Sequence, residues 1–511
     1  MKPTGFVQAA LALPGIIIIV SASPAANETS ICCNALAHQL PAIFHGQVSP
    51  DFNGLVQSRW SGTSILHPGC VMTPQSADDV SRIVRILSKK QCQFAVKGGG
   101  HNANPGANSI DGGVSIDLVR LNSANLAPDR SYVSLGAGLT WGQAYARFNN
   151  SQVGFPGGVC DGVSVGGVSL GGGQSLFQAK MGWVVDNVLE YQLVLASGDV
   201  VTASQHRRPD LFKALKGGNT NFGIVTRVKI TAFDFPGMWS GQVISSMDKG
   251  PTNRSDLLDG VSHALVKFVA DNNKDVDSGA QVATAYLRHN GGQILLSALT
   301  NVANVANPPS LRSFSALPNQ VLSTGGHVKI GDFVHQLTEL QPTGFRQVTA
   351  GVTIDNDFET VRQVWDASDE VYNSLPHKDK VDWIFFLFPQ PVVQQSYSKK
   401  RGGNSLGLSD NKKDQFVVWL ASRWSDASLD GMMEKARADF IDATVAVAKK
   451  HNAYSPFLYI NYAAPEQDPL CGYGAKSVAF LKRTAKKYDP SGVFQKLMPG
   501  GFKVSQAKCG R

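Results

Sequence analysis

Hydrophobic residues recur along the first half of the chain with two periods, one typical of helices and one typical of strands. In residues 76–91 they lie three or four positions apart, and Ser76 is placed to cap the first turn with Asp79 three residues on, which predicts a helix. Residues 94–96 are a short hydrophobic run that predicts a buried strand leading into a glycine loop. By the same criteria we expect strands at 114–118, 132–135 and 222–233, a hairpin of 188–195 and 200–203, and helices at 140–148 and 210–216.

The pattern changes near residue 238, where the glycine density falls and a second set of elements begins. The length of 511 residues and the hydrophobic content of 43% are sufficient for two domains with packed cores. Helices and strands are mixed in both halves, which predicts an α+β fold. In the second half we expect helices at 256–270 and 429–450 and strands at 280–287, 294–299, 383–388 and 416–424.

Residues 1–25 have the pattern of a secretory signal peptide. Lys2 precedes a hydrophobic stretch at 6–20, and small residues follow at 21–26, where we expect cleavage. The stretch is short and interrupted by a proline and a glycine, and no later stretch is longer, so we expect no membrane span. The protein is predicted to be secreted or to reside in the lumen of the secretory pathway. Export would expose to glycosylation three sequons, which begin at Asn27, Asn149 and Asn253.

The chain has seven cysteines, an odd number. In an oxidising compartment six of them can form three disulfides, which leaves one unpaired. Cys160 is the expected unpaired residue because its glycine setting, residues 157–162, indicates another role. Among the many possible pairings we expect one link, from Cys32 or Cys33 to Cys70.

The formal net charge of +8 does not indicate nucleic-acid binding. The basic residues are scattered in short groups such as 207–208 and 399–401, and no basic stripe is interleaved with aromatic residues. We therefore assign these groups to the solvated surface and expect no nucleic-acid partner. A diffuse positive field would still favour anionic substrates.

Two nucleophilic side chains are set among glycines, His101 in residues 97–102 and Cys160 in residues 157–162. Glycine permits positive φ and lets the backbone approach a flat ligand closely. An imidazole and a thiol presented in this way point to a large planar molecule, and a redox cofactor is the natural candidate.

Three other kinds of site find less support in the sequence. Ser164 and Ser169 each match the G-x-S-x-G nucleophile elbow of serine hydrolases, but no hydrophobic strand precedes Ser164, and glycines occupy the expected helix. No G-x-G-x-x-G motif opens a helix after a strand, as a Rossmann dinucleotide site requires. The eleven histidines include no H-E-x-x-H motif, and the cysteines have no metal-ligand spacing. A hydrolase, a Rossmann fold and a metal site are therefore all disfavoured.

Several separated motifs, in order, give the chain a resemblance to a known family. It resembles the FAD-linked oxidoreductases of the berberine bridge enzyme type, within the vanillyl-alcohol oxidase superfamily, and is most similar to the secreted fungal branch. The resemblance is carried by Cys33 and by residues 67–71, 94–101, 160–173, 216–225, 459–463 and 489–494.

The resemblance implies a two-domain arrangement. An FAD-binding domain at 26–237, with a PCMH-type core at about 64–235, would be followed by a substrate domain at 238–455, an antiparallel sheet flanked by helices. The C-terminal segment, 456–511, would return to the FAD domain. FAD is then the implied cofactor.

The family's functional residues map onto this sequence by position. His101 would bond to the flavin 8-methyl carbon and Cys160 to carbon 6, and in the family such links raise the oxidising power of the flavin. From the residues alone, His101 could instead be a hydrogen-bonded loop histidine, and Cys160 a disulfide partner or an inert thiol. The implied flavin contacts are Lys97, Gly98, Gly99, Gly100, Asn102, Val163, Gly166, Gly167, Gly171, Asn221, Gly223, Ile224, Val225 and Asn461.

The resemblance also implies a reaction. Tyr462 would take a substrate hydroxyl proton while hydride leaves for the flavin, unless it only packs on the ring. Val163 stands where a small aliphatic residue accompanies oxygen use, so we expect an oxidase that produces hydrogen peroxide. The aromatic strand at 383–388 favours a small secondary metabolite, oxidised at an alcohol or activated C–H, as substrate. An oligosaccharide oxidase acting at the anomeric carbon and a non-redox cyclase are the alternatives, and the oligomeric state is not predicted.

Overall fold

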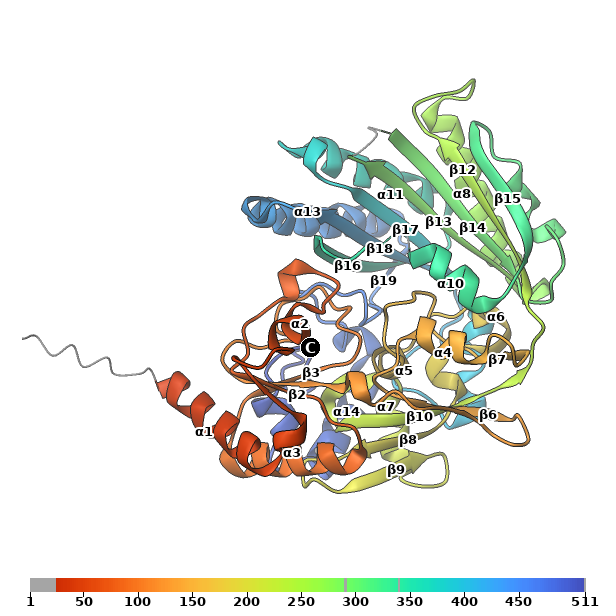
Figure 1. Ribbon diagram of the computed structural model, residues 1–511. Coiled ribbons are helices and arrows are strands. Elements are labelled where there is room, and N and C mark those ends of the chain that lie inside the picture. The colour runs from red at the N-terminus through yellow and green to blue at the C-terminus, as the bar shows by residue number, and fades with distance from the viewer. Residues whose placement is uncertain (1–23, 289–291, 339–340, 510–511) are drawn as a thin grey trace, which may run out of the picture.

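The computed structural model describes residues 24–288, 292–338 and 341–509. The proposed signal peptide lies almost entirely outside these residues and stays a prediction. Figure 1 shows two parts, a lower one built from the N-terminal half and the C-terminal segment, and an upper one built around a large sheet. No helix in the described ranges is long and apolar enough to cross a membrane.

The lower part contains two main sheets. The first has the order β1-β2-β4-β3, in which β2, β4 and β3 run parallel. The second is antiparallel, with the order β5-β6-β10-β8-β9. The strands of the two sheets are β1 (Phe44–Gly46), β2 (Cys70–Met72), β3 (Phe94–Lys97), β4 (Val114–Asp117), β5 (Ala124–Leu126), β6 (Tyr132–Gly136), β8 (Val188–Val194), β9 (Val200–Ser204) and β10 (Ile224–Thr231).

The helices of the lower part agree with the hydrophobic pattern. In α3 (Ala77–Lys90) the Ser76 hydroxyl accepts from the Asp79 amide, as predicted, and the hydrophobic face of the helix is buried. In α4 (Trp141–Phe148) a capping box at Thr140 fixes the first turn. The hairpin of β8 and β9 is confirmed. The helix α7 (Pro209–Gly218) loses helical geometry at Lys216 and Gly217, close to the predicted end.

One local expectation was wrong. We expected the glycines after Ser164 to prevent a helix, but α5 (Val165–Gly171) begins directly after that serine. The Ser164 hydroxyl accepts from the Gly167 amide and caps the helix. The helix forms because tertiary packing holds these glycines: an added Cβ at Gly166 would meet the Ala137 carbonyl at 3.0 Å. Such burial offsets the low helix propensity of glycine.

Three disulfides occur in the described residues, and Cys160 is the free cysteine. The expected link to Cys70 is confirmed, with Cys33 as its partner. Its neighbour Cys32 pairs with Cys92, so two adjacent links fasten α1 (Pro24–Gln39) to the first sheet and to the end of α3. The third link, Cys471–Cys509, closes the C-terminal segment.

The upper part is an antiparallel sheet of eight strands in the order β15-β12-β14-β13-β17-β18-β16-β19. Three helices, α8 (Arg254–Asp271), α11 (Phe358–Asn373) and α13 (Asp430–Lys450), pack together on one face of the sheet. The strands are β12 (Met238–Ser246), β13 (Ser278–Leu287), β14 (Gly292–Asn301), β15 (Gln320–Val328), β16 (Arg346–Asp355), β17 (Trp383–Gln390), β18 (Gln415–Trp424) and β19 (Tyr454–Ser455).

The hydrophobic strand β17 serves two cores because its side chains alternate between the faces of the sheet. Trp383 and Phe385 pack among the covering helices, where Phe385 meets Trp365 edge-on with ring centroids 4.8 Å apart. Phe386 and Phe388 point the other way and belong to the core of the lower part. The sheet thus presents an aromatic face to the lower domain.

After β19 the chain returns to the lower part (Figure 1). The helix α14 (Ala475–Tyr488) packs on α7, and Phe494 meets Phe94 of β3 edge-on at 6.2 Å between ring centroids. The Asn221 side chain donates to the carbonyl of Phe502. These contacts make the C-terminal segment part of the lower core.

Candidate functional site

A large cavity lies between the loops of the lower part and the inner face of the upper sheet. Its empty space is about 1890 Å³, part of which is open to solvent. Glycines of three separate loops line one side, and side chains of β13, β14, β17 and β18 line the other. No Asp, Glu, Lys or Arg is among the described residues that line it.

Close packing of two glycine loops shapes the lower side of the cavity. The loop after β3 touches the loop before α5 so closely that a Cβ on Gly99 would lie 2.5 Å from the Gly162 carbonyl oxygen. Gly98 presses on Ser164 in the same way, and Gly100 has a φ of +70°, which favours glycine. The glycines are therefore needed to bring the two loops together.

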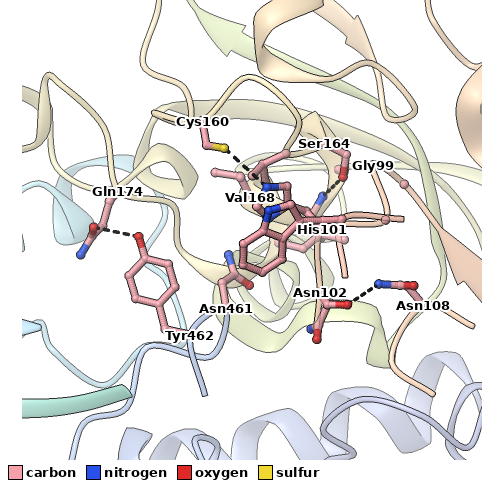
Figure 2. Close-up of a pocket in the computed structure, with 18 of the residues that line it drawn as sticks. Gly99, His101, Asn102, Asn108, Cys160, Ser164, Val168, Gln174, Asn461 and Tyr462 are labelled. Atoms are coloured by element: carbon pink, nitrogen blue, oxygen red, sulfur yellow. Dashed lines mark hydrogen bonds between the residues drawn. The ribbon is translucent and has the colours of Figure 1, made fainter. Parts of the chain in front are cut away.

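This packing puts the two predicted nucleophiles side by side. His101 Nε2 lies 3.5 Å from Cys160 Sγ (Figure 2). The imidazole also stacks on the Trp60 ring, with ring centroids 4.2 Å apart and an angle of 11° between the planes. Burial lowers the pKa of His101 to about 4. The ring is therefore neutral at ordinary pH, with a nitrogen lone pair available for bonding.

The Cys160 thiol has a different environment. Burial raises the pKa of Cys160, while a hydrogen bond from Thr338 and the amides of Gly162 and Val163 act in the opposite direction. The Thr338 Oγ1 atom lies 3.8 Å from Cys160 Sγ, and Thr338 is the last residue of the helix α10 (Ile330–Thr338). The thiol thus lies beside the end of a helix that comes from a distant part of the sequence.

Tyr462 lies beside the aromatic face of the sheet. Its ring stacks on Trp419 with centroids 4.5 Å apart, and its hydroxyl donates to Gln174 Oε1 at 3.3 Å (Figure 2). Burial, followed by the nearby Tyr459 and Cys160, raises the pKa of Tyr462 well above its usual value of 10. The phenol is therefore protonated near neutral pH in this cavity.

Tyr459 has a separate structural role. Its hydroxyl accepts from the Gly173 amide and from the Asn461 side chain, both at 3.0 Å. Burial raises the pKa of Tyr459 to about 12. These two hydrogen bonds hold the Tyr459 side chain in place. Tyr459 therefore anchors the turn that carries Tyr462.

The upper wall of the cavity is hydrophobic with few polar groups. Phe386 stacks on Phe388 and on Trp419, with ring centroids 5.4 Å and 5.1 Å apart. The Trp419 indole nitrogen is buried and has no hydrogen-bond partner among the described residues. The smaller or polar members of this wall are Gln281, Ala283, Leu296, Ala298 and Thr349.

Most predicted site residues line this one cavity. Three do not: Lys97 is buried in an ion pair with Asp117 at 2.9 Å, Asn221 binds the C-terminal segment, and Gly171 lies against the Asn461 side chain. The predicted residues that do line it are Gly98, Gly99, Gly100, His101, Asn102, Cys160, Val163, Gly166, Gly167, Gly223, Ile224, Val225, Asn461 and Tyr462.

The sequence reasoning missed four residues with clear roles in the site: Trp60, Gln174, Thr338 and Trp419. Gln174 directly follows the glycine run at 171–173, and this position was the one available signal. The other three come from segments far away in the sequence and reach the cavity only through the fold.

The residues of the cavity suit a flavin dinucleotide. Glycine loops without side chains permit close approach of a flat ring and offer backbone amides, and a neutral imidazole and a thiol both face the space. The cavity extends from these loops to the aromatic wall of the sheet, which leaves a facing surface for a substrate.

Comparison with known proteins gives the same answer. Residues 68–204 match the FAD binding domain family. The FAD-dependent monooxygenase tpcD of Cochliobolus heterostrophus is 32% identical over 448 residues, which cover 86% of this chain and 85% of the relative. The FAD-dependent monooxygenase sdcF of Emericella nidulans is 30% identical, covering 94% of this chain and all of the relative.

Two solved structures share the fold at low identity. Xylooligosaccharide oxidase from Myceliophthora thermophila C1, in complex with xylobiose, has a TM-score of 0.75 at 20% identity and covers 93% of this chain and 99% of its own. Glucooligosaccharide oxidase from Acremonium strictum, described with a 6-S-cysteinyl, 8α-N1-histidyl FAD, has a TM-score of 0.73 at 17% identity, with coverages of 94% and 99%.

Fold, site and relatives together define the class of protein. This chain belongs to the FAD-linked oxidoreductases of the berberine bridge enzyme type, and its curated relatives are fungal. It is an FAD-dependent oxidoreductase with FAD as its cofactor.

Proposed function

We propose that this protein is an oxidase that removes hydride from an alcohol or an activated C–H of a small, uncharged aromatic metabolite, with O₂ as electron acceptor and hydrogen peroxide as product. The observation that carries the substrate class is the upper wall, where three stacked aromatic rings stand opposite the cofactor loops and no charged side chain lines the described cavity. Such a surface favours flat hydrophobic ligands.

We also propose that His101 and Cys160 hold the cofactor covalently, at the flavin 8-methyl carbon and carbon 6. Their side chains lie 3.5 Å apart and both face the cavity, and the pKa of His101 is low enough to keep the imidazole neutral. The stacked Trp60 ring limits rotation of the imidazole. When bound, FAD supplies the acceptor for hydride at its N5 atom.

In the reaction Tyr462 is the proposed proton acceptor for the substrate hydroxyl. His101 and Cys160 are assigned to the cofactor, and the Tyr459 oxygen already accepts two hydrogen bonds, so Tyr462 is the remaining titratable side chain of the described lining. The raised pKa means that the base form is scarce at neutral pH, and turnover would rise with pH.

The test is anaerobic bleaching of the purified yellow protein by two matched panels, hydroxylated aromatic compounds and neutral oligosaccharides. We expect loss of the oxidised flavin absorbance with members of the aromatic panel, and hydrogen peroxide when air is admitted. Bleaching by the oligosaccharides alone would contradict the aromatic assignment. Bleaching without peroxide would contradict the oxidase assignment.

Carbohydrate oxidation is a second candidate, because both structural neighbours reported above are named as oligosaccharide oxidases. Gln281, Gln341 and Thr349 offer polar groups at the cavity that could bind sugar hydroxyls. The bleaching experiment decides between the candidates directly.

The covalent links have their own test. Acid precipitation should leave the yellow colour in the pellet, and mass spectrometry of the peptides that contain His101 and Cys160 should find flavin on both. A colourless pellet would contradict the proposed attachment. The three disulfides of the described residues support the further proposal that the protein is exported.

A further inference from the structure

Thr338 connects the helix α10 to the loop that carries Cys160. It is the last residue of α10 (Ile330–Thr338), a helix that follows β15 and packs against α4. The amide of Asp161 donates to Thr338 Oγ1 at 2.8 Å, which fixes the position of the oxygen. The same oxygen lies 3.0 Å from the Val334 carbonyl oxygen and 3.8 Å from Cys160 Sγ.

The Thr338 hydroxyl has one proton and two acceptors within reach. It can donate to the Val334 carbonyl, one turn back in its own helix, or to the Cys160 sulfur. A hydrogen bond to an ionised acceptor is about twice as strong as one to a neutral acceptor. The proton therefore moves to the sulfur when Cys160 is a thiolate, and the hydroxyl stabilises the form that reacts.

The surroundings of Cys160 make this hydrogen bond important. Burial raises the thiol pKa, and the nearby Asp161 carboxylate acts in the same direction, although that carboxylate is itself paired with His335 at 3.2 Å. His101, whose Nε2 lies 3.5 Å away, is neutral, and Tyr462 is protonated. None of these groups is a cation in direct contact with the sulfur. Neutral hydrogen-bond donors must therefore stabilise the negative charge of the thiolate.

We propose that Thr338 is a positioning residue for covalent attachment of FAD to Cys160, because its hydroxyl donates to the sulfur and holds it as a thiolate facing the cofactor. The second link would then depend on α10, whose buried residues Phe333 and Val334 lie in the core of the lower part and which packs on α4. This inference rests on the proposed attachment of FAD at Cys160.

The bond-forming step balances with O₂ as the oxidant. The Cys160 S–H and the flavin C6–H bonds break, both hydrogens leave as protons, and an S–C6 bond forms. The electron pair of the C6–H bond reduces the ring system. O₂ then takes this pair with two protons and leaves as hydrogen peroxide.

The experiment compares holoenzymes that carry Thr338→Val, Thr338→Ser and no change. The measured quantity is the fraction of the Cys160 peptide that carries flavin, with the fraction on the His101 peptide as an internal measure of cofactor loading. At about pH 7 we expect Thr338→Val to form the Cys160 link about tenfold more slowly, the effect of losing a hydrogen bond to a charged group. Thr338→Ser should restore the link, and the His101 link should be complete in all three.

A pH dependence separates activation of the thiol from a merely structural role. Raising the pH of Thr338→Val in air from about 7 to about 9 should restore the Cys160 link, because the thiolate fraction of a thiol whose pKa is raised by burial still increases about tenfold per pH unit. The matched control is Thr444→Val, which removes from α13 of the sheet domain a buried hydroxyl that has no hydrogen-bond partner in the described part of the chain. It should link like the unchanged protein.

Two outcomes would overturn the inference, and they are distinguishable. If the unchanged protein and Thr338→Val link Cys160 at the same rate, Thr338 has no role in attachment, while the proposed attachment stands. If the unchanged protein carries flavin on His101 alone, the proposed attachment at Cys160 fails and Thr338 has no reaction to assist. A defect in Thr338→Val that higher pH does not relieve would also contradict activation of the thiol.

Discussion

The two sides of the cavity are built on opposite principles. On the lower side the glycine loops matter because they lack side chains: a single Cβ on Gly99 would meet the backbone of the facing loop. On the upper side the sheet matters because of its side chains, above all Phe386, Phe388 and Trp419. The comparison teaches that backbone packing shapes the lower side, whereas the upper side is shaped by side chains that can change without altering the fold.

The largest expected effect comes from adding one methyl group to the lower side. Gly99→Ala should lose flavin retention and all turnover, since the new Cβ forces the loops of His101 and Cys160 apart at a cost of about 1–3 kcal/mol or more. The measurement is yellow colour in the acid precipitate together with the melting temperature. Gly54→Ala is the control, because no facing atom of the residues that the structure describes lies within 4 Å of its added Cβ. Normal flavin retention in Gly99→Ala would contradict the packing argument.

A smaller but still large effect is expected at the boundary between the two sides. Tyr462→Phe should lower kcat/KM about 10²–10⁴-fold, the usual contribution of a general base. Because the pKa of Tyr462 is raised, kcat/KM of the unchanged enzyme should increase about tenfold per pH unit below that pKa. The variant should lose this slope. A pH profile that is the same in both proteins would show that Tyr462 only packs on the cofactor.

The upper side can be tested with two neighbouring residues of β17. Phe386→Ala removes a ring from the cavity and should raise KM for an aromatic substrate about tenfold, with a modest loss of stability. Phe385→Ala removes a ring from the helix-covered face and should cost about 3–5 kcal/mol of unfolding free energy with little change in KM. Urea unfolding and steady-state kinetics measure both. If the two variants shift KM equally, the division of the strand between cavity and core is wrong.

The smallest effect is expected at Ser164, the serine that matches the nucleophile-elbow motif of serine hydrolases. Ser164→Ala removes the N-cap of α5 and should lower the unfolding free energy by about 1 kcal/mol. Flavin should remain bound and turnover should persist. Abolished turnover with an intact flavin spectrum would assign this serine a chemical role that the structure does not support.

The sequence was sufficient to predict the local features of the lower side of the cavity. The glycines around His101 and Cys160 indicated two loops that the structure brings together at one cavity, and the odd number of cysteines predicted one free thiol, which the structure shows to be Cys160. The cap of α3 at Ser76 also followed from local pattern. Each of these depends on residues close together in the chain, where spacing and side-chain chemistry decide the outcome.

The sequence was not sufficient to predict which side chains of the upper side face the cavity. Residues 383–388 are all hydrophobic. No alternation of hydrophobic and polar residues therefore indicated which side chains face the cavity. Likewise no local signal could pair Cys32 with Cys92, or predict that glycines after Ser164 would form a helix. In these cases distant segments supply the deciding contacts.

By itself the sequence determined the class of the protein, its cofactor and the two candidate attachment residues, because motifs that bind a flat cofactor are short and continuous. The tertiary structure alone decided that Trp60 stacks on His101, that Thr338 reaches Cys160, and that Tyr462 lies among aromatic rings with no cationic side chain among the described residues of the cavity. The physical reason is that burial, stacking and pKa depend on atoms brought together across hundreds of residues, which no local spacing records.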